Sequence, residues 1–213
     1  MARITVLGAG LVGALVATEL SEDHYIKVID PDREALVRVT QLAPAVELHD
    51  ARFDSPAQLA DCDLALNCLP GSVGHAALRR IIAAGVDCVD ISFTAEDPRT
   101  LDTVAREAGV TIVPDAGIAP GFSNLLAAEL AAQAPARLEI FVGGLPLRRE
   151  PPWEYAAPFS PIDVVAEYER PARLKRAGRD VAEPALSGCH PFRLPPGLVS
   201  ALPDGTALEA FLT

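Results

Sequence analysis

The feature that most constrains the fold is a glycine pattern near the N-terminus. Ile4–Leu7 is a short apolar run suited to a buried strand, and Ala14–Leu20 is rich in helix-forming residues. Between them stand Gly8, Ala9, Gly10, Leu11, Val12 and Gly13. A strand, then G-x-G-x-x-G, then a helix is the context that a dinucleotide-binding turn requires. The pattern therefore predicts a nucleotide site formed by these six residues.

Each glycine of the pattern has a distinct role in such a turn. Gly8 permits the tight turn, Gly10 lets the backbone approach a pyrophosphate, and Gly13 allows the helix to pack closely on the strand. The N-terminus of the helix would offer N–H groups and a positive dipole end to the phosphates. The alternative is a glycine turn that is purely structural.

An acidic residue follows the second predicted strand, His24–Ile29. Asp30 lies twenty residues beyond Gly10, where a carboxylate accepts hydrogen bonds from the ribose hydroxyls of the adenosine. Because a carboxylate there repels a 2′-phosphate, we expect NAD as the cofactor. Arg33 could instead accommodate that phosphate, and in another interpretation Asp30 and Asp32 only cap the next helix.

Strand and helix patterns then alternate as far as Val113. Further strands are predicted over residues 45–53, 63–69, 86–93 and 110–113, and helices over 34–42, 73–84 and 97–108. This alternation predicts an α/β fold with a doubly wound parallel (Rossmann) sheet. Ligands of such sheets lie beyond the carboxyl ends of the strands. We therefore expect Asn67, Leu69 and Pro70 to form a wall of the cofactor site, and 51–54 to contact the adenine.

Composition excludes several classes of partner. The chain has 213 residues, of which 50% are hydrophobic, and a formal net charge of -11. Such a charge argues against a nucleic-acid or anionic-membrane partner, and the N-terminal apolar run is too short to span a bilayer. The four cysteines form no C-x-x-C pair, so we interpret them as buried free thiols and expect no metal site. A cytoplasmic protein is expected.

A loop rich in glycine and proline follows the sixth predicted strand. It reads DAGIAPGFSN over Asp115–Asn124, and Asp115 is expected to face the ligand crevice. The alternative is a stiff crossover loop in which Ser123 caps the next helix. We place the domain boundary here, with a nucleotide-binding domain over 1–122 and a substrate or dimerisation domain over 123–213.

The second domain is predicted to be α+β. We expect a strand over 137–142, a helix capped by Ser160 and running to about Tyr168, strands over 170–186 with a turn at Gly178, and a last strand over 207–212. The aromatic residues Trp153, Tyr155, Phe159 and Tyr168 would line a substrate pocket or form a small core. Because the last strand would leave one face uncovered, we expect the domain to be truncated.

Several of these segments together resemble one family. The segments DAGIAPGFSN, VGGLP, PPWEY and FSPIDVVAEYERPARL are similar to those of the saccharopine-dehydrogenase-like oxidoreductases, with lysine 6-dehydrogenase as the most similar branch. The similarity extends from the first strand to the final LEAFLT. Family members are longer and complete the second domain beyond that point.

This resemblance implies NAD-linked oxidation of an amino-acid amine. For L-lysine the ε-carbon would be oxidised, and hydrolysis would give a semialdehyde that cyclises. Since Lys27 and Lys175 are the only lysines, we infer that Asp90 and Asp115 handle the cationic substrate and its proton. Arg170 or Arg173 would pair with the substrate carboxylate. We expect a homo-oligomer, most simply a homodimer.

Two other functions remain open at this stage. One keeps the fold and carries out reductive condensation with NADPH, as saccharopine reductase or carboxynorspermidine-type enzymes do. The other is a truncated paralogue that binds NAD without turnover.

Overall fold

The computed structural model describes residues 1–134, 138–146, 148, 155–157, 159–193 and 207–210. The chain divides into two compact units, Met1–Leu138 and Glu139–Thr213. The boundary predicted from sequence, between residues 122 and 123, lies sixteen residues earlier, at the start of the helix Phe122–Ala131 (α5).

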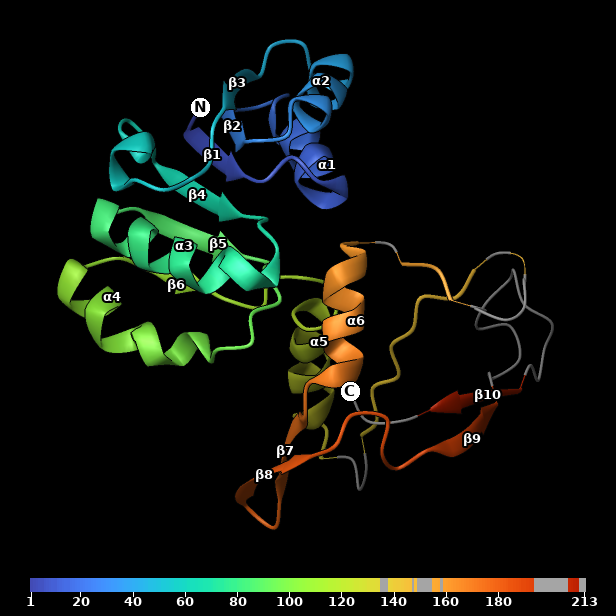
Figure 1. Cartoon of the computed structure of the whole chain (residues 1–213). Helices are drawn as coiled ribbons and strands as arrows, with labels where there is room; N and C mark the ends of the chain where they lie inside the picture. The colour runs from blue at the N-terminus through green and yellow to red at the C-terminus, as the bar shows by residue number, and fades with distance from the viewer. Residues whose placement is uncertain (135–137, 147, 149–154, 158, 194–206, 211–213) are drawn as a thin grey trace. The chain divides into compact units, whose positions relative to one another are not determined.

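The first unit contains a six-stranded sheet whose paired strands are all parallel (Figure 1). Its strands are β1 (Arg3–Leu7), β2 (Tyr25–Asp30), β3 (Glu47–Asp50), β4 (Leu64–Asn67), β5 (Asp87–Asp90) and β6 (Ile112–Val113). They lie in the order β3-β2-β1-β4-β5-β6. The strand order reverses between β1 and β4, and that point is where doubly wound sheets bind dinucleotides.

Helices cover both faces of the sheet. The helices are α1 (Leu11–Leu20), α2 (Arg33–Leu42), α3 (Gly71–Ala84) and α4 (Asp102–Ala108), with 3₁₀ turns at Pro56–Leu59 and Pro98–Leu101. In Figure 1, α1 and α2 lie beside β1 and β2, and α3 and α4 lie beside β4 to β6. The predicted doubly wound architecture is confirmed.

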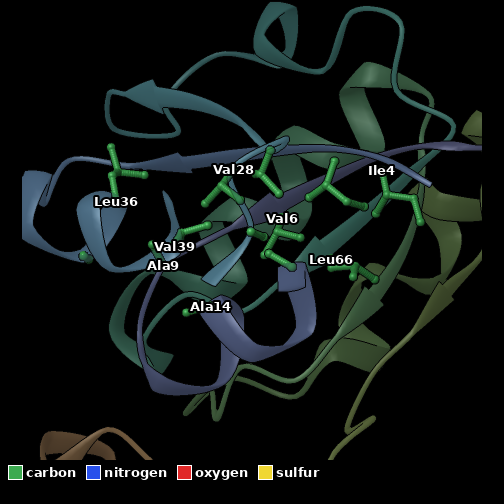
Figure 2. Packing of buried hydrophobic residues seen from close by; sticks show 13 residues of the cluster. Ile4, Val6, Ala9, Ala14, Val28, Leu36, Val39 and Leu66 are labelled. Carbon is green, nitrogen blue, oxygen red and sulfur yellow. The ribbon is translucent and has the colours of Figure 1, made fainter. Parts of the chain in front are cut away.

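Two separate cores explain why β1 and β2 carry apolar side chains on both faces of the sheet. Val6 and Val28 belong to the cluster that packs against α1 and α2, which Figure 2 shows together with Ala14 and Val39. Their chain neighbours Leu7 and Ile29 belong to the cluster that packs against α3 and α4. Because successive side chains of a strand point to opposite faces, a continuous apolar run fits a sheet covered on both sides.

Helix ends in this unit follow local signals. Asp32 caps α2, and its Oδ1 accepts hydrogen bonds from the backbone N–H groups of Glu34 (2.9 Å) and Ala35 (3.3 Å). Gly85 and Gly109 end α3 and α4 in the left-handed conformation that glycine tolerates best. The Ser123 cap of the alternative interpretation is wrong: Ser123 lies inside α5, and Asn124 Oδ1 accepts from the Gly121 N–H at 2.9 Å instead.

The second unit contains short elements. They are α6 (Pro161–Glu169), β7 (Ala172–Arg176), β8 (Arg179–Glu183), β9 (His190–Arg193) and β10 (Ala207–Ala210). The strands β7 and β8 form an antiparallel hairpin, as predicted, because Ala177 and Gly178 both take positive φ values, 47° and 77°. The last predicted strand pairs with β9 over its described residues.

Two expectations for this unit are wrong. Residues 138–142 form no strand, although RLEIFV alternates; Arg137 lies outside the described residues. No described strand pairs with this segment, and Phe141 stacks on Phe192 with ring centroids 4.1 Å apart. A strand depends on a partner, which periodicity alone cannot supply.

The predicted cap of α6 is the second of these expectations. Ser160 precedes α6, yet its side chain makes no capping bond within the described structure.

In the part of the chain that the structure describes, no helix is long and apolar enough to cross a membrane.

Candidate functional site

The residues Gly8–Gly13, here called the glycine loop, lie directly beyond β1, at the point where the strand order reverses. Gly8 has a φ of 99°, and a Cβ there would stand 2.7 Å from the carbonyl oxygen of Cys68. A Cβ on Gly13 would overlap the carbonyl oxygen of Gly8. By contrast, a Cβ on Gly10 would meet nothing within 4 Å. Two of the glycines are therefore required by the fold, whereas Gly10 borders open space.

That open space suits a pyrophosphate. No described side chain caps the N-terminus of α1, whose N-cap is Gly10, so the helix end can present its N–H groups to an anion. Leu11 and Val12 are exposed at this end, and Ala9 is buried. At the carboxyl end of β4, the buried acceptor Asn67 Oδ1 also has no hydrogen-bond partner among the described residues. These features fit a bound dinucleotide.

The carboxylate of Asp30 is fixed at the edge of the same loop. Its Oδ2 accepts a hydrogen bond from the Ala9 N–H at 2.6 Å, and its Oδ1 accepts from the Asp32 N–H at 2.7 Å. Since Asp32 caps α2, the two acidic residues have different roles. Asp30 lies where the ribose-binding carboxylate of a dinucleotide fold is expected.

Arg33 pairs with an acidic residue that the sequence analysis did not single out. Its Nε donates to Asp50 Oδ2, and Asp50 lies opposite Asp30 in the parallel register of β2 and β3. The available signal was an acidic residue inside the third predicted strand, 45–53, directly before the segment expected to contact the adenine. The ends of β2 and β3, where the adenosine is expected, form the candidate adenosine edge. This edge carries the carboxylates of Asp30 and Asp50 and the guanidinium of Arg33.

The end of β4 forms the other side of the reversal point. Asn67 is its last residue, and the Cys68 N–H continues the sheet by donating to the Leu7 carbonyl at 2.9 Å. Leu69 is half-buried and Pro70 is exposed directly before α3. This placement beside the glycine loop suits the predicted cofactor wall, and contact with a cofactor stays a prediction.

A buried polar cluster joins β4, β5 and α3 beneath this edge. Asp90 Oδ1 accepts hydrogen bonds from the Ser92 N–H (3.0 Å) and the Ser92 hydroxyl (2.6 Å). Asn67 Nδ2 lies 3.3 Å from both Ser92 Oγ and the Gly74 carbonyl oxygen. Asn67, Asp90 and Ser92 are all at most 5% exposed. The sequence analysis missed Ser92 because it lay inside the predicted strand 86–93 without any motif, whereas β5 ends at Asp90.

Burial raises the pKa of Asp90 above its usual value, although the hydrogen bonds from Ser92 oppose the rise. The negative charge of Asp115 contributes a smaller upward shift of the same pKa. Burial likewise raises the pKa of the nearby Cys68 thiol to about 12, so this cysteine stays protonated near neutral pH.

Asp115 lies in a loop attached to the end of β5. The Ala116 N–H donates to the Asp90 carbonyl at 2.9 Å, and Asp115 itself is exposed with a φ of 54°. The structure therefore brings the two predicted catalytic carboxylates to one edge, with Asp90 inside and Asp115 at the surface. Direct contact of either with a substrate stays a prediction.

The two predicted substrate-binding arginines belong to the second unit. Arg170 follows α6 and is half-buried, and Arg173 is exposed in β7. The rings of Tyr155 and Tyr168 meet edge to face with their centroids 6.1 Å apart. Burial raises the pKa of Tyr168, and the neighbouring Tyr155 raises it further. Trp153 lies outside the described residues. The substrate pocket and the small core both stay predictions.

The cysteines are free, but they are not uniformly buried. Cys88 is buried and Cys62 and Cys68 are half-buried, whereas Cys189 is exposed, which corrects the expectation for that residue. Among the described residues, no three His, Cys, Asp or Glu side chains gather as metal ligands would.

Substitution of Gly74 tests the packing of the polar cluster. A Cβ there would overlap the Ser92 hydroxyl and lie 3.0 Å from Thr94 Cγ2. We expect Gly74→Ala to lower the free energy of unfolding by about 1–3 kcal/mol, because this close packing leaves no room. Chemical denaturation measures the loss, and Gly85→Ser serves as a control without a clash, though with some strain from its positive φ. Unchanged stability in Gly74→Ala would contradict the packing described here.

Comparison with known proteins identifies the family. Residues 4–113 match the family described as "Saccharopine dehydrogenase NADP binding domain". This chain belongs to the saccharopine dehydrogenase family. Residues 117–212 match the family described as "Saccharopine dehydrogenase C-terminal domain", so the assignment extends over both parts of the chain.

Similar proteins are considerably longer. The mitochondrial alpha-aminoadipic semialdehyde synthases of Bos taurus and Mus musculus are 27% and 26% identical over 194 and 195 residues, which is 84% of this chain and 21% of theirs. The structure of saccharopine dehydrogenase (L-Glu forming) from Saccharomyces cerevisiae superimposes with a TM-score of 0.67 at 19% identity, covering 92% of this chain and 48% of that one. This last similarity shows the fold alone.

Proposed function

We propose that this chain forms part of an NAD-dependent amino-acid dehydrogenase that oxidises the ε-carbon of L-lysine to the semialdehyde. The observation that carries the cofactor preference is the Asp30 carboxylate, held at the glycine loop by the Ala9 N–H. Membership of the saccharopine dehydrogenase family supports oxidoreductase chemistry on an amino acid. The choice of lysine rests on the resemblance of the DAGIAPGFSN and FSPIDVVAEYERPARL segments.

The bound cofactor would accept a hydride from the substrate carbon. Within the loop Gly8–Gly13, the N–H groups at the start of α1 would bind the pyrophosphate, because the N–H groups of Gly8 and Ala9 are held by the Ile29 carbonyl and by Asp30. Asp30 would bind the ribose hydroxyls. Asp115, exposed at the carboxyl edge, would hold the substrate ammonium and receive its proton. Asp90, at 2% exposed, would position this edge through Ser92 rather than meet the substrate directly.

The experiment is an assay of the native full-length protein with L-lysine and NAD. Since the ε-ammonium has a pKa of about 10.4, we expect the rate of NADH formation to rise with pH towards about 10. Asp115→Asn should lower kcat/KM by about a hundredfold, because it removes the carboxylate that holds and deprotonates the substrate.

Glu96→Gln is the matched control. It neutralises an acidic residue in the loop after β5 and should retain the activity of the wild type. If lysine produced no NADH at any pH, lysine would be excluded as the substrate.

Reductive condensation with NADPH is a second candidate function. Arg33 beside the adenosine edge and the match to an NADP binding domain both favour it. Consumption of NADPH in the presence of an amino acid and a carbonyl-bearing partner, without NAD reduction by lysine, would support it. Binding of NAD in calorimetry without any turnover would instead indicate a nucleotide-binding paralogue.

A further inference from the structure

The edge formed by β2 and β3 carries two carboxylates with different partners. Asp30 is held by the backbone N–H groups of Ala9 and Asp32, so its charge faces no cation in the described structure. Asp50, its register partner in the neighbouring strand, holds Arg33 in an ion pair. The guanidinium that could receive a 2′-phosphate therefore already donates its Nε–H to a carboxylate.

A phosphate at this position would meet two obstacles. It would have to share the Arg33 guanidinium with Asp50 or draw it away, and it would approach two negative charges. An Arg fork binds phosphate well only when its N–H groups are available. A diol, in contrast, needs an acceptor such as Asp30 and no cation. The geometry favours a ribose without a 2′-phosphate.

We infer that Asp50 is a specificity-determining residue, which selects NAD over NADP by holding Arg33 and adding a second negative charge. The inference rests on the proposed use of NAD. It assigns to Asp50 a role that neither the glycine pattern nor Asp30 predicts. Asp50 acts through Arg33 and through its charge, without contact to the reacting atoms.

The size of the effect follows from exposure. The Arg33 side chain is 86% exposed and that of Asp50 is 41% exposed, so solvent screens the pair. Exposed ion pairs change equilibria by up to about fivefold. Asp50→Asn should therefore strengthen NADPH binding by about fivefold, while NADH binding stays nearly constant.

The test is a fluorescence titration of the full-length protein with NADH and NADPH. In an Asp50→Asn background, Arg33→Ala should remove most of the gain in NADPH affinity, because the freed guanidinium supplies the larger part and loss of the Asp50 charge supplies the rest. Glu47→Gln is the matched control. It removes from the same strand a carboxylate that pairs with His49 and not with Arg33, and it should change neither affinity. Thermal unfolding of each variant checks that folding is retained.

Separate outcomes decide the inference and the proposed function. If the wild type prefers NADH and Asp50→Asn leaves the NADPH affinity unchanged, the role of Asp50 is overturned and the use of NAD stands. If the wild type binds NADPH more tightly, the proposed use of NAD fails and the inference fails with it. A gain in NADPH affinity that depends on Arg33 supports both.

Discussion

Replacement of Gly13 by valine is expected to abolish dinucleotide binding and to lower the free energy of unfolding by about 3 kcal/mol or more. Any Cβ at this position would overlap the Gly8 carbonyl oxygen and lie 3.3 Å from Cys68 Cβ. The helix α1 would have to move away from β1, which would open the loop that Gly8 closes. Calorimetry with NADH and denaturation in urea measure the two effects.

Gly10→Ala is the matched control, because it adds a Cβ where the protein leaves space. Gly10 has a φ of −65°, which alanine adopts without strain, and its Cβ would meet nothing within 4 Å. We expect unchanged stability and NADH binding weakened by about tenfold or more, since the methyl group would occupy space beside the pyrophosphate. Full NADH affinity in Gly10→Ala would remove this loop from the cofactor site.

Replacement of Asp90 by alanine is expected to destabilise the first unit by roughly 3 kcal/mol. The substitution leaves the Ser92 N–H and hydroxyl without their acceptor in a buried position, and each unpaired buried donor costs about 1–3 kcal/mol. Asp90→Asn retains an oxygen acceptor and should cost much less. Urea denaturation of the two variants side by side separates loss of the hydrogen bonds from loss of the charge.

The difference in stability between the wild type and Asp90→Asn should depend on pH with a definite sign. Burial raises the folded-state pKa of Asp90 above 3.8, so the unfolded chain ionises this group first as pH rises. The folded state then binds more protons, and wild-type stability falls relative to Asp90→Asn from about pH 4 upward until the folded-state pKa is passed. A stability difference that is independent of pH would contradict the buried, proton-retaining carboxyl described here.

Sequence alone predicted the parts of this protein that depend on local rules. Gly8 and Gly13 stand at fingerprint spacing after an apolar strand, and the structure places both in contacts that exclude a side chain. The alternation of apolar strands with helices predicted a sheet covered on both faces, and the two cores confirm it. Turn geometry at Gly178 was also readable, because positive φ values favour glycine.

Side-chain partners, in contrast, were decided by the tertiary structure. Spacing from Gly10 pointed to Asp30, but it left open that Asp30 and Asp32 both cap α2; the hydrogen bonds place Asp30 at the glycine loop and Asp32 at the cap. The burial of Asp90 depends on Ser92 and on the approach of α3, and the pairing of Arg33 depends on β3 lying beside β2.

The segment 138–142 shows the same limit. Its alternation predicted a strand, but no described strand pairs with it. The sequence determined where the backbone turns and which faces are buried, because those properties follow from neighbours along the chain. The tertiary structure decided which charges meet, because those contacts join residues that are distant in sequence.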